Sequence, residues 1–444
     1  MKVIHVPFCF RPDPVGGTEV YVEALAREQQ RRGVQIIVAA PARETAGYAD
    51  AGLTVRRFAT SGNADLKSLY GEGDQSARRE FGRLVDQERP DIVHLHAFTS
   101  AVSAQLALDA RKRGVRVIFT YHTPTVSCLR GTLMRWGREV CDGKLDVQPC
   151  AGCALHGLGV GRRTGVMLGH LPSTVGQVVG GVGLAGGVWT GLRMTDLVRT
   201  QHTAFRSFIG SMDRVVVLCQ WTEELLVRNG VPKRKLMLSR HGLVDSRPGS
   251  EHGPPPETDQ SRQSPLRMAF VGRLHPTKGL ETLLRALARV PDARLSLDVF
   301  GVPEDTDAKG YADSLRALAA VDSRICFRAP VANDQVVGFL SGYDLLAVPS
   351  LWLETGPLVV LEAFAAGIPV IGSKRGGIAE LVQDRVNGLL VEPESVDAWS
   401  GVLHELASDP ELVQRLRAGV RPPRRMKAVA DDMLRLYDDV LQAE

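Results

Sequence analysis

The sequence predicts an α/β protein built from two doubly wound parallel sheets. In both halves of the 444-residue chain, short β-branched runs alternate with amphipathic helical patterns, and a segment rich in Pro, Ser and charge separates the halves. Glycine is abundant (45 residues) and aromatic residues make up only 6% of the chain, which suits tight turns between strands and helices. The length suits two or three domains.

The first half alternates strands and helices up to about residue 120 and resumes the alternation after residue 210. The first helix is expected to end before Gly33, because a residue without a side chain suits the position after a helix. The expected strands are residues 3–6, 34–39, 53–58, 91–95, 115–120, 214–219 and 235–240. The expected helices are residues 18–32, 75–88, 101–113 and 221–229. This alternation predicts parallel βαβ units.

The second half repeats the pattern after a linker at residues 246–265, which have no hydrophobic periodicity. Its expected strands are residues 267–271, 295–300, 324–327, 344–348 and 369–371. The expected domains are residues 1–245 with an insert at about 124–210, then residues 266–423, and a C-terminal helix at 424–444 that packs back on the first domain. Two such domains place an active site in the cleft between them, at the carboxyl ends of the strands.

Charge and short motifs exclude several classes. The chain has 54 Lys and Arg residues against 50 Asp and Glu, a net charge of +4, which is too even for a dedicated nucleic-acid-binding protein. A dinucleotide oxidoreductase is disfavoured, because no G-x-G-x-x-G follows the first strand. The N-terminus lacks the long apolar stretch of a signal peptide, so we expect a cytoplasmic protein.

The most informative stretch contains two glutamates, Glu354 and Glu362, which are separated by seven residues. Residues 357–366 have the pattern of a helix, with Thr355 or Gly356 as its cap. Glu354 then lies in the loop before the helix and Glu362 about two turns inside it. Carboxylates suit vicinal sugar hydroxyls, because one group can accept two O–H donors.

The start of this helix is a second candidate for ligand binding. Pro357 suits the first turn, and the amides of Gly356, Leu358 and Val359 are expected at the positive end of the helix dipole. Such amides bind a phosphate or a sugar hydroxyl.

This segment resembles the glutamate pair of the retaining glycosyltransferases of family 4, which have the GT-B fold. Further motifs similar to that family occur in the same order over nearly the whole chain: PVGGTEVYVEALAREQQRRG at 14–33, DIVHLH at 91–96, TYHT at 120–123, VGRLHPTKG at 271–279 and LRLY at 434–437. The resemblance implies two Rossmann-like domains that face each other across a cleft, with a cysteine-containing insert in the N-terminal one.

The resemblance also implies roles for donor-binding residues. Glu362 binds the ribose hydroxyls of a nucleotide, and Glu354 binds hydroxyls of the transferred sugar with help from the amides at 356–358. Arg273 and Lys278 neutralise the diphosphate, as a bidentate fork and a point charge. The family often has Gly-Phe-Gly after the first glutamate, whereas this chain has Thr-Gly-Pro, which leaves the identity of the sugar open.

Three residues of the first domain complete the implied site. Gly16 and Gly17 let the backbone approach the diphosphate or the acceptor, and His122 contacts the donor sugar near the reacting centre. For His94 and His96, which face the same side of a strand, core packing and ligand contact both remain open.

The implied reaction transfers a sugar from a UDP- or GDP-sugar to a glycan, a lipid-linked or a small-molecule acceptor, as in polysaccharide biosynthesis. It retains the anomeric configuration and needs no catalytic metal, because two cations can stabilise the departing diphosphate. The alternatives are another GT-B enzyme, such as a sugar-nucleotide epimerase or a phosphorylase, and a non-catalytic nucleotide- or carbohydrate-binding protein. No pyridoxal phosphate lysine of a phosphorylase can be placed.

The insert contains four clustered cysteines, with the spacing C-x12-C-x8-C-x2-C. They are Cys128, Cys141, Cys150 and Cys153. In a chain without a secretion signal, such a cluster indicates a structural zinc site more than disulfides, and an iron–sulfur cluster needs the same ligands. Four unconnected thiols are the alternative.

Residues 164–192 carry no formal charge and contain repeated Gly-x3-Gly spacings. Glycine weakens a helix and the segment interrupts a domain, so a membrane span is disfavoured. Either closely packed helices line the cleft, or the segment rests on a membrane to reach a lipid-linked acceptor. Arg162, Arg163 and Arg193 flank it, which suits an anionic surface and also ordinary solvation.

Overall fold

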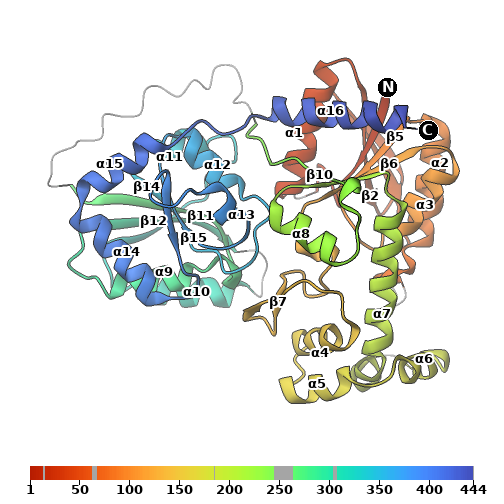
Figure 1. Ribbon diagram of the computed structural model, residues 1–444, viewed down its shortest axis with the longest axis horizontal. Helices are drawn as coiled ribbons and strands as arrows, with labels where there is room; N and C mark the ends of the chain where they lie inside the picture. The colour runs from red at the N-terminus through yellow and green to blue at the C-terminus, as the bar shows by residue number, and fades with distance from the viewer. Residues whose placement is uncertain (14–15, 63–67, 185, 245–263, 304–307, 444) are drawn as a thin grey trace. The chain divides into compact units, whose positions relative to one another are not determined.

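The computed structural model describes all residues except 14–15, 63–67, 185, 245–263, 304–307 and 444 (Figure 1). The chain forms two compact units: unit 1 comprises Met1–Arg240 and Met426–Glu444, and unit 2 comprises His241–Arg425. Most of the predicted linker at 246–265 lies outside the described residues.

Unit 1 contains an eight-stranded sheet in the order β10-β9-β6-β5-β1-β2-β4-β3. Its strands are β1 (Lys2–Val6), β2 (Gln35–Ala42), β3 (Ala46–Asp50), β4 (Leu53–Ala59), β5 (Ile92–Leu95), β6 (Arg116–Tyr121), β9 (Arg214–Val217) and β10 (Leu236–Leu238). All neighbours are parallel except the edge pair β3–β4, which is antiparallel. The sheet's helices include α1 (Gly17–Arg31), α2 (Gln75–Glu88), α3 (Ala104–Lys112) and α8 (Gln220–Arg228). The predicted α/β class is confirmed.

The strand order of unit 1 reverses at β1. From β1 the chain passes to β2 on one side and later returns to β5 on the other. Ligands of doubly wound sheets bind outside the carboxyl ends of the strands at such a reversal. The N-terminus of α1 and the end of β5 lie at this point of unit 1.

The last helix, α16 (Met426–Gln442), belongs to unit 1 and packs on α1. Its buried face shares one core with α1, including Met433, Leu436, Val22 and Leu25. Burying large aliphatic side chains contributes roughly 1.5–3 kcal/mol each, so this contact ties the end of the chain firmly to unit 1.

The insert of unit 1 is a short hairpin followed by four helices. The hairpin pairs β7 (Met134–Arg135) with β8 (Glu139–Val140), and the helices are α4 (Val147–Gly157), α5 (Arg162–Gly169), α6 (Ser173–Gly181) and α7 (Gly187–Ser211). Helix α7 connects the other three to the sheet (Figure 1). A side chain at Gly165 would meet the backbone of Gly152 at 3.0 Å, so close packing of α5 on α4 accounts for these glycines.

The uncharged segment 164–192 therefore spans most of α5, all of α6 and the start of the 25-residue helix α7. Among the described residues, no helix combines the length and the hydropathy that a membrane span requires. Arg193, one of its expected flanking charges, is 7% exposed and donates a hydrogen bond to the carbonyl of Leu184 at 3.1 Å. The expectation of a solvated Arg193 is therefore wrong, because packing of α6 against α7 covers this side chain.

Unit 2 contains a six-stranded sheet, entirely parallel, in the order β13-β12-β11-β14-β15-β16. Its strands are β11 (Leu266–Leu274), β12 (Leu295–Pro303), β13 (Ile325–Arg328), β14 (Leu345–Val348), β15 (Val370–Ser373) and β16 (Gly388–Val391). Its helices are α9 (Leu280–Ala288), α10 (Ala308–Ala319), α11 (Val336–Leu340), α12 (Leu358–Ala365), α13 (Gly376–Leu381), α14 (Val396–Ser408) and α15 (Pro410–Gly419). The strand order reverses between β11 and β14, which run side by side.

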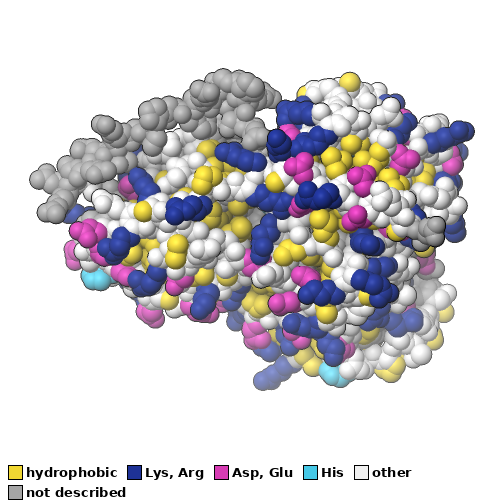
Figure 2. Space-filling model, turned by 45° about the horizontal axis from the view of Figure 1, so that its top comes forward, with side chains coloured by type: hydrophobic (Ala, Val, Ile, Leu, Met, Phe, Trp, Pro, Cys, Tyr) yellow, Lys and Arg dark blue, Asp and Glu magenta, His cyan; other side chains and the backbone are white. Residues whose placement is uncertain are grey.

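Charged side chains are distributed over the surface. Figure 2 shows Lys and Arg interspersed with Asp and Glu over the visible face instead of gathered in one patch. This distribution agrees with the small net charge of +4.

Candidate active site

In unit 2, two charged side chains meet beyond the carboxyl ends of β11 and β14. Lys278 follows β11 in a short turn (Pro276–Lys278), and Glu354 follows β14. The Nζ atom of Lys278 lies 2.6 Å from Oε1 of Glu354. These residues are 76 positions apart in the sequence, and they meet at the reversal of the strand order, where a ligand site is expected.

Close backbone packing brings the two loops together. The amide of Leu351 donates to the carbonyl of Thr277 at 2.7 Å. Gly279 has a φ of +68°, and a Cβ atom there would lie 1.9 Å from the carbonyl oxygen of Pro349. Only glycine permits both this conformation and this approach. The position of Lys278 beside Glu354 therefore depends on the glycine that follows it.

The environment of Glu354 keeps its carboxylate ionised. The side chain is 8% exposed, and burial alone would raise its pKa. The charge and hydrogen bond of Lys278 outweigh burial, with help from Trp352 and Ser350, whose hydroxyl donates to Oε1 at 2.9 Å; the pKa of Glu354 is lowered as a result. The Nζ atom of Lys278 also lies 5.4 Å from the centre of the Trp352 ring.

Glu362 lies on α12 in a different environment. It is partly buried, and no hydrogen bond or ion pair to its carboxylate occurs among the described residues. Burial raises the pKa of Glu362 to about 7. A buried carboxylate without a partner is costly, so a ligand with two hydroxyl groups that hydrogen-bond to Glu362 would be favourable here.

The helix itself differs slightly from expectation. It begins at Leu358 with Pro357 as the N-cap, instead of Thr355 or Gly356, because the fixed φ of proline suits the entry to a helix. Gly356 has a φ of +145°, and a Cβ atom there would lie 2.7 Å from the ring of His241. The amides of Leu358 and Val359 thus begin the helix, next to a glycine that no other residue can replace without strain.

Arg273 lies at the exposed carboxyl end of β11, five residues before Lys278. Unit 2 therefore places its predicted donor-binding residues at the end of β11, on the two loops after β11 and β14, and on α12. Direct contact is found for Lys278 with Glu354.

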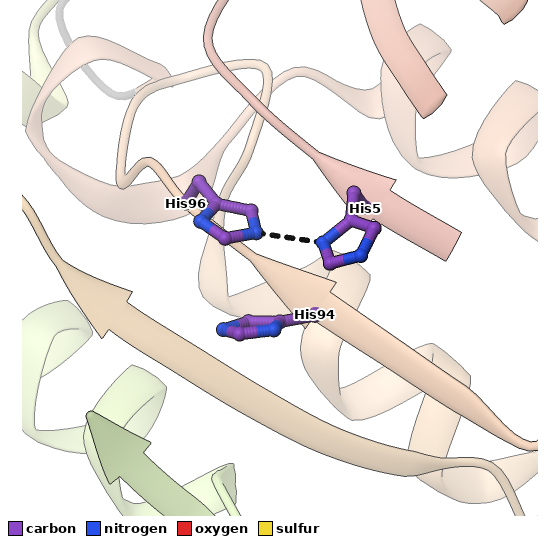
Figure 3. Close-up of side chains that lie close together, drawn as sticks. All are labelled: His5, His94 and His96. Carbon is purple, nitrogen blue, oxygen red and sulfur yellow. Dashed lines mark hydrogen bonds between the residues drawn. The ribbon is translucent and has the colours of Figure 1, made fainter. Parts of the chain in front are cut away.

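In unit 1, four buried histidines lie at the reversal of the strand order. His5 is on β1, His94 is on β5, and His96 and His122 directly follow β5 and β6; all four are at most 5% exposed. Figure 3 shows His5 joined to His96 by a hydrogen bond, with the ring of His94 beside them. The bond joins Nδ1 of His5 to Nε2 of His96 at 2.9 Å, and Nδ1 of His96 lies 3.0 Å from Nε2 of His122.

The last hydrogen bond in this row of histidines, between His5 and Gln29, determines which ring nitrogens carry protons. Nε2 of His5 lies 2.7 Å from Oε1 of Gln29, an oxygen that can only accept. His5 therefore donates from Nε2 and accepts at Nδ1, His96 donates to it from Nε2, and His122 donates from Nε2 to His96. Burial lowers the pKa of His5 to about 4 and those of His94 and His96 well below the ordinary value, so these rings are neutral at pH 7.

In the described part of the chain, one group of three side chains could hold a metal ion: His5, His94 and His96, whose ring nitrogens include atoms within 4.8 Å of one another. Both ring nitrogens of each are already hydrogen-bonded; His94 contacts the Tyr437 hydroxyl at 2.6 Å and Oγ1 of Thr120 at 2.7 Å. This arrangement is that of a satisfied polar network. For His94, core packing is the reading that these contacts favour.

The other predicted residues of unit 1 lie near this network. The ring of His122 packs edge-on against Tyr21 of α1, with ring centres 4.9 Å apart. The amide of Gly16 donates to the Glu19 carboxylate at 2.9 Å, which caps α1. Gly17 is exposed, with nothing within 4 Å of the place where a Cβ would lie, so a ligand can approach its backbone.

Several contributing residues were not among the predicted site residues. Trp352 and Ser350 lie beside Glu354, and no pattern in the sequence indicated their part. His5 and Gln29 complete the histidine chain. The signal for His5 was a histidine inside an apolar strand, a position where a polar group needs a partner.

The fold places the chain among GT-B proteins. Sucrose-phosphate synthase from Thermosynechococcus elongatus is similar over 100% of both chains, with a TM-score of 0.64 and 18% identity. HepE from Anabaena, solved with UDP-glucose, is similar over 99% of this chain and 100% of its own, with a TM-score of 0.61 and 15% identity. At this identity the likeness shows the fold alone, and it confirms the predicted fold class.

The family follows from the sequence. Residues 16–240, half of the chain, match the glycosyl transferase 4-like domain, and residues 257–421 match the glycosyl transferases group 1. This chain belongs to the group 1 glycosyltransferase family, as its motifs predict. It is 36% identical over 205 residues to a D-inositol 3-phosphate glycosyltransferase from Corynebacterium glutamicum, a match that covers 42% of this chain and 48% of the relative. The chain thus spans about half the length of that relative, and about a third of the length of others.

Proposed function

We propose that this protein transfers a sugar from a UDP- or GDP-sugar to a hydroxylated acceptor, with retention of the anomeric configuration. Unit 2 binds the donor, and unit 1 binds the acceptor. The observation that carries the proposal is the contact of Lys278 with Glu354 at the strand reversal of unit 2, in a chain of the group 1 glycosyltransferase family.

The charges of unit 2 fit a sugar diphosphate. Breaking the bond between sugar and phosphate leaves negative charge on the diphosphate, and Lys278 and Arg273 supply two positive charges to stabilise it. A diphosphate that binds Lys278 competes with Glu354 for the ammonium group. Glu354 then becomes available to accept hydroxyls of the transferred sugar, and Glu362 accepts the ribose hydroxyls. The departing phosphate can itself take the proton of the acceptor, so no separate base is required.

A cavity in unit 1 fits an acceptor with several hydroxyl groups. Its volume is about 280 Å³, near the lower end for small-molecule sites, and its polar lining includes Ser68, Thr99, Ser103, Thr125, Arg130 and Gln201. The Oγ atom of Ser103 and the Oε1 atom of Gln201 are buried and have no hydrogen-bond partner among the residues that the structure describes. Buried polar atoms without partners are costly, and hydroxyl groups of an acceptor would satisfy them.

Nucleotide binding and product analysis test this proposal. We expect calorimetry to detect UDP or GDP binding that Glu362→Ala weakens, and NMR of a transfer product to show the anomeric configuration of the donor sugar. A variant of the acceptor cavity, Gln201→Leu, should leave nucleotide binding unchanged and lower transfer. Nucleotide binding without any transfer to a panel of sugar, polyol and lipid-linked acceptors would favour the non-catalytic alternative; an inverted product would contradict retention.

We further propose that the insert contacts an anionic membrane surface from the cytoplasmic side. None of the seven cysteines, all of which are described, forms a disulfide, which fits a reducing compartment. The uncharged segment exposes large apolar side chains on α5, on and directly after α6, and at the start of α7, namely Val166, Met167, Val178, Val182, Val188 and Trp189. Exposed Arg163 adds a positive charge beside them, and a basic border around an apolar surface suits anionic lipids.

Vesicle sedimentation tests this contact. We expect binding to phosphatidylglycerol vesicles and much weaker binding to phosphatidylcholine vesicles. Met167→Ser together with Trp189→Ser should reduce the binding, whereas Val321→Ser, which alters an exposed valine of unit 2, should not. Equal sedimentation of both variants would contradict the assignment to the insert.

A further inference from the structure

The four cysteines of the insert come from three separate segments and line a single cavity. Cys128 follows a short turn (Pro124–Val126), Cys141 follows β8, and Cys150 and Cys153 lie one turn apart on α4. All four line a cavity of about 90 Å³ within unit 1. Chance does not readily bring four thiols of a seven-cysteine chain to one cavity, so the cluster needs a physical explanation.

Backbone amides point at two of these sulfur atoms. The amide of Gly143 donates to Sγ of Cys141 at 3.5 Å, and the amide of Trp136 donates to Sγ of Cys153 at 3.3 Å. Sγ of Cys150 lies 3.9 Å from the carbonyl oxygen of Lys144. Backbone N–H groups aimed at sulfur stabilise a thiolate much more than a thiol. The backbone around Cys141 and Cys153 therefore suits negatively charged sulfur.

Burial acts in the opposite direction as long as no cation is near. Thiolates at these positions need a cation beside them. The same cavity is lined by His202, which is 2% exposed and whose Nδ1 atom has no hydrogen-bond partner in the described structure. This nitrogen is a further polar atom that a ligand in the cavity would satisfy.

We propose that Cys128, Cys141, Cys150 and Cys153 bind one structural Zn²⁺ ion. Four thiolates give the closed tetrahedral set of a structural zinc site, with no open position for catalysis. Sugar transfer from a nucleotide involves no oxidation or reduction, so a redox-inactive ion fits the protein better than an iron–sulfur cluster.

Zinc binding draws the sulfur atoms closer together. Zn–S bonds of about 2.3 Å in a tetrahedron place the sulfur atoms about 3.8 Å apart. Within the described residues, no three cysteine sulfurs lie within 4.8 Å of one another. The segments that must move are a turn and a hairpin with two residues in each strand, whereas Cys150 and Cys153 already share a helix face. The ion therefore orders the loop around Cys128 and the β7–β8 hairpin against α4.

This contraction links the metal to the proposed acceptor site, so its functional part rests on the proposed function. Cys128, Leu129 and Arg130 line both the cysteine cavity and the larger cavity of about 280 Å³. A zinc ion bound to Cys128 fixes the shared wall. We expect loss of the ion to weaken acceptor use and to leave nucleotide binding by unit 2 unchanged.

Metal analysis of the full chain, purified without chelator, tests the site independently of activity. We expect one zinc ion per chain by mass spectrometry of the metal content, and its loss in Cys150→Ser and Cys153→Ser. Cys326→Ser, which alters a free cysteine of unit 2, and His202→Gln should both retain it. Protein that contains no zinc and takes up none would overturn the proposal, as would iron with acid-labile sulfide, or loss of zinc in His202→Gln.

Cobalt replacement keeps the test valid if the cysteine variants fail to fold. The wild-type chain loaded with Co²⁺ should show intense sulfur-to-cobalt charge-transfer absorption and the visible bands of a tetrahedral ion; octahedral cobalt spectra would contradict four thiolate ligands. Removal of zinc should raise the acceptor KM by at least about tenfold with an unchanged nucleotide Kd. If wild type binds zinc but transfers no sugar, the proposed function fails and the metal site stands. If wild type transfers sugar but binds no zinc, the metal site fails and the proposed function stands.

Discussion

Replacing Lys278 by methionine should destabilise unit 2 and identify the pair with Glu354 as the centre of its charged site. The two side chains are 20% and 10% exposed, and their charged atoms lie 2.6 Å apart. At an effective dielectric constant of about 20, two charges at this distance attract by about 6 kcal/mol. Desolvation of both groups offsets much of this attraction. Removing one partner leaves a buried carboxylate alone, which typically costs about 3–5 kcal/mol.

We expect Lys278→Met to lower the free energy of unfolding of unit 2 by about 3 kcal/mol, the lower end of this range, because Lys278 keeps some contact with water. A matched control exists in the same unit: Arg285 and Glu281 on α9 lie 2.7 Å apart, but their side chains are 58% and 44% exposed. Exposed pairs one helical turn apart contribute only about 0.3–0.5 kcal/mol, so Arg285→Met should have a small effect. The difference between the two variants measures the effect of burial.

Native-state hydrogen exchange of β11 and β14 amides is the suitable assay, because a chain of two units does not unfold in one step. The lowered pKa of Glu354 stabilises unit 2 above the ordinary pKa of 4.5, and this contribution is lost as the pH falls through the lower folded value. In Lys278→Met the main influence that lowers this pKa is lost and only Ser350 and Trp352 still oppose burial, so the pKa should rise and the difference in stability between variant and wild type should shrink towards pH 4.5. A second change, Glu354→Gln, should restore most of the stability. Equal losses in Lys278→Met and Arg285→Met would refute this reasoning.

Two further predictions concern pH. Glu362 has a pKa of about 7, and its ionised form can accept two hydroxyl groups. The affinity for UDP or GDP should therefore rise between pH 6 and 8 in wild type, whereas in Glu362→Gln the affinity should be lower and independent of pH. Calorimetric affinities that change with pH in the same way in both proteins would contradict this role. Below pH 6.5 the unfolded chain takes up a proton at His5 that the native chain does not bind until about pH 4. Unit 1 should therefore lose about 3.5 kcal/mol of stability over this range (about 1.4 kcal/mol for each of about 2.5 pH units), and thermal unfolding of His5→Gln should show a smaller pH dependence.

The sheets could be predicted largely from the sequence, because most strands are short apolar runs that are buried on both faces. The exception in unit 1 is β3, whose sequence AGYAD has one residue that favours strands and lies at the sheet edge, where partial exposure removes the hydrophobic signal. The amino-acid composition of the uncharged segment also did not show that it forms separate helices. Their breaks, for example around Pro172, follow from local turns that split one uncharged run into α5, α6 and α7.

The contacts within the candidate site were harder to predict from the sequence than the strands and helices. Order and spacing indicate that Lys278 and Glu354 act on one ligand, but their contact depends on the packing of Gly279 on Pro349, which no local pattern encodes. The histidine chain likewise requires the parallel pairing of β1 with β5, in which His5 lies opposite His94. Contacts between distant segments are set by the register of the sheet.

Burial has different consequences for charge in the two units. Unit 2 holds an ionised pair in which Lys278 already has a partner, so in the proposed reaction a diphosphate would exchange one anion for another at little electrostatic cost and would free Glu354 for the sugar. In unit 1, burial keeps His5, His94 and His96 neutral at pH 7, and both ring nitrogens of each are hydrogen-bonded. Unit 2 thus keeps its buried charge because a partner of opposite sign lies beside it, whereas unit 1 satisfies its buried imidazoles without any charge.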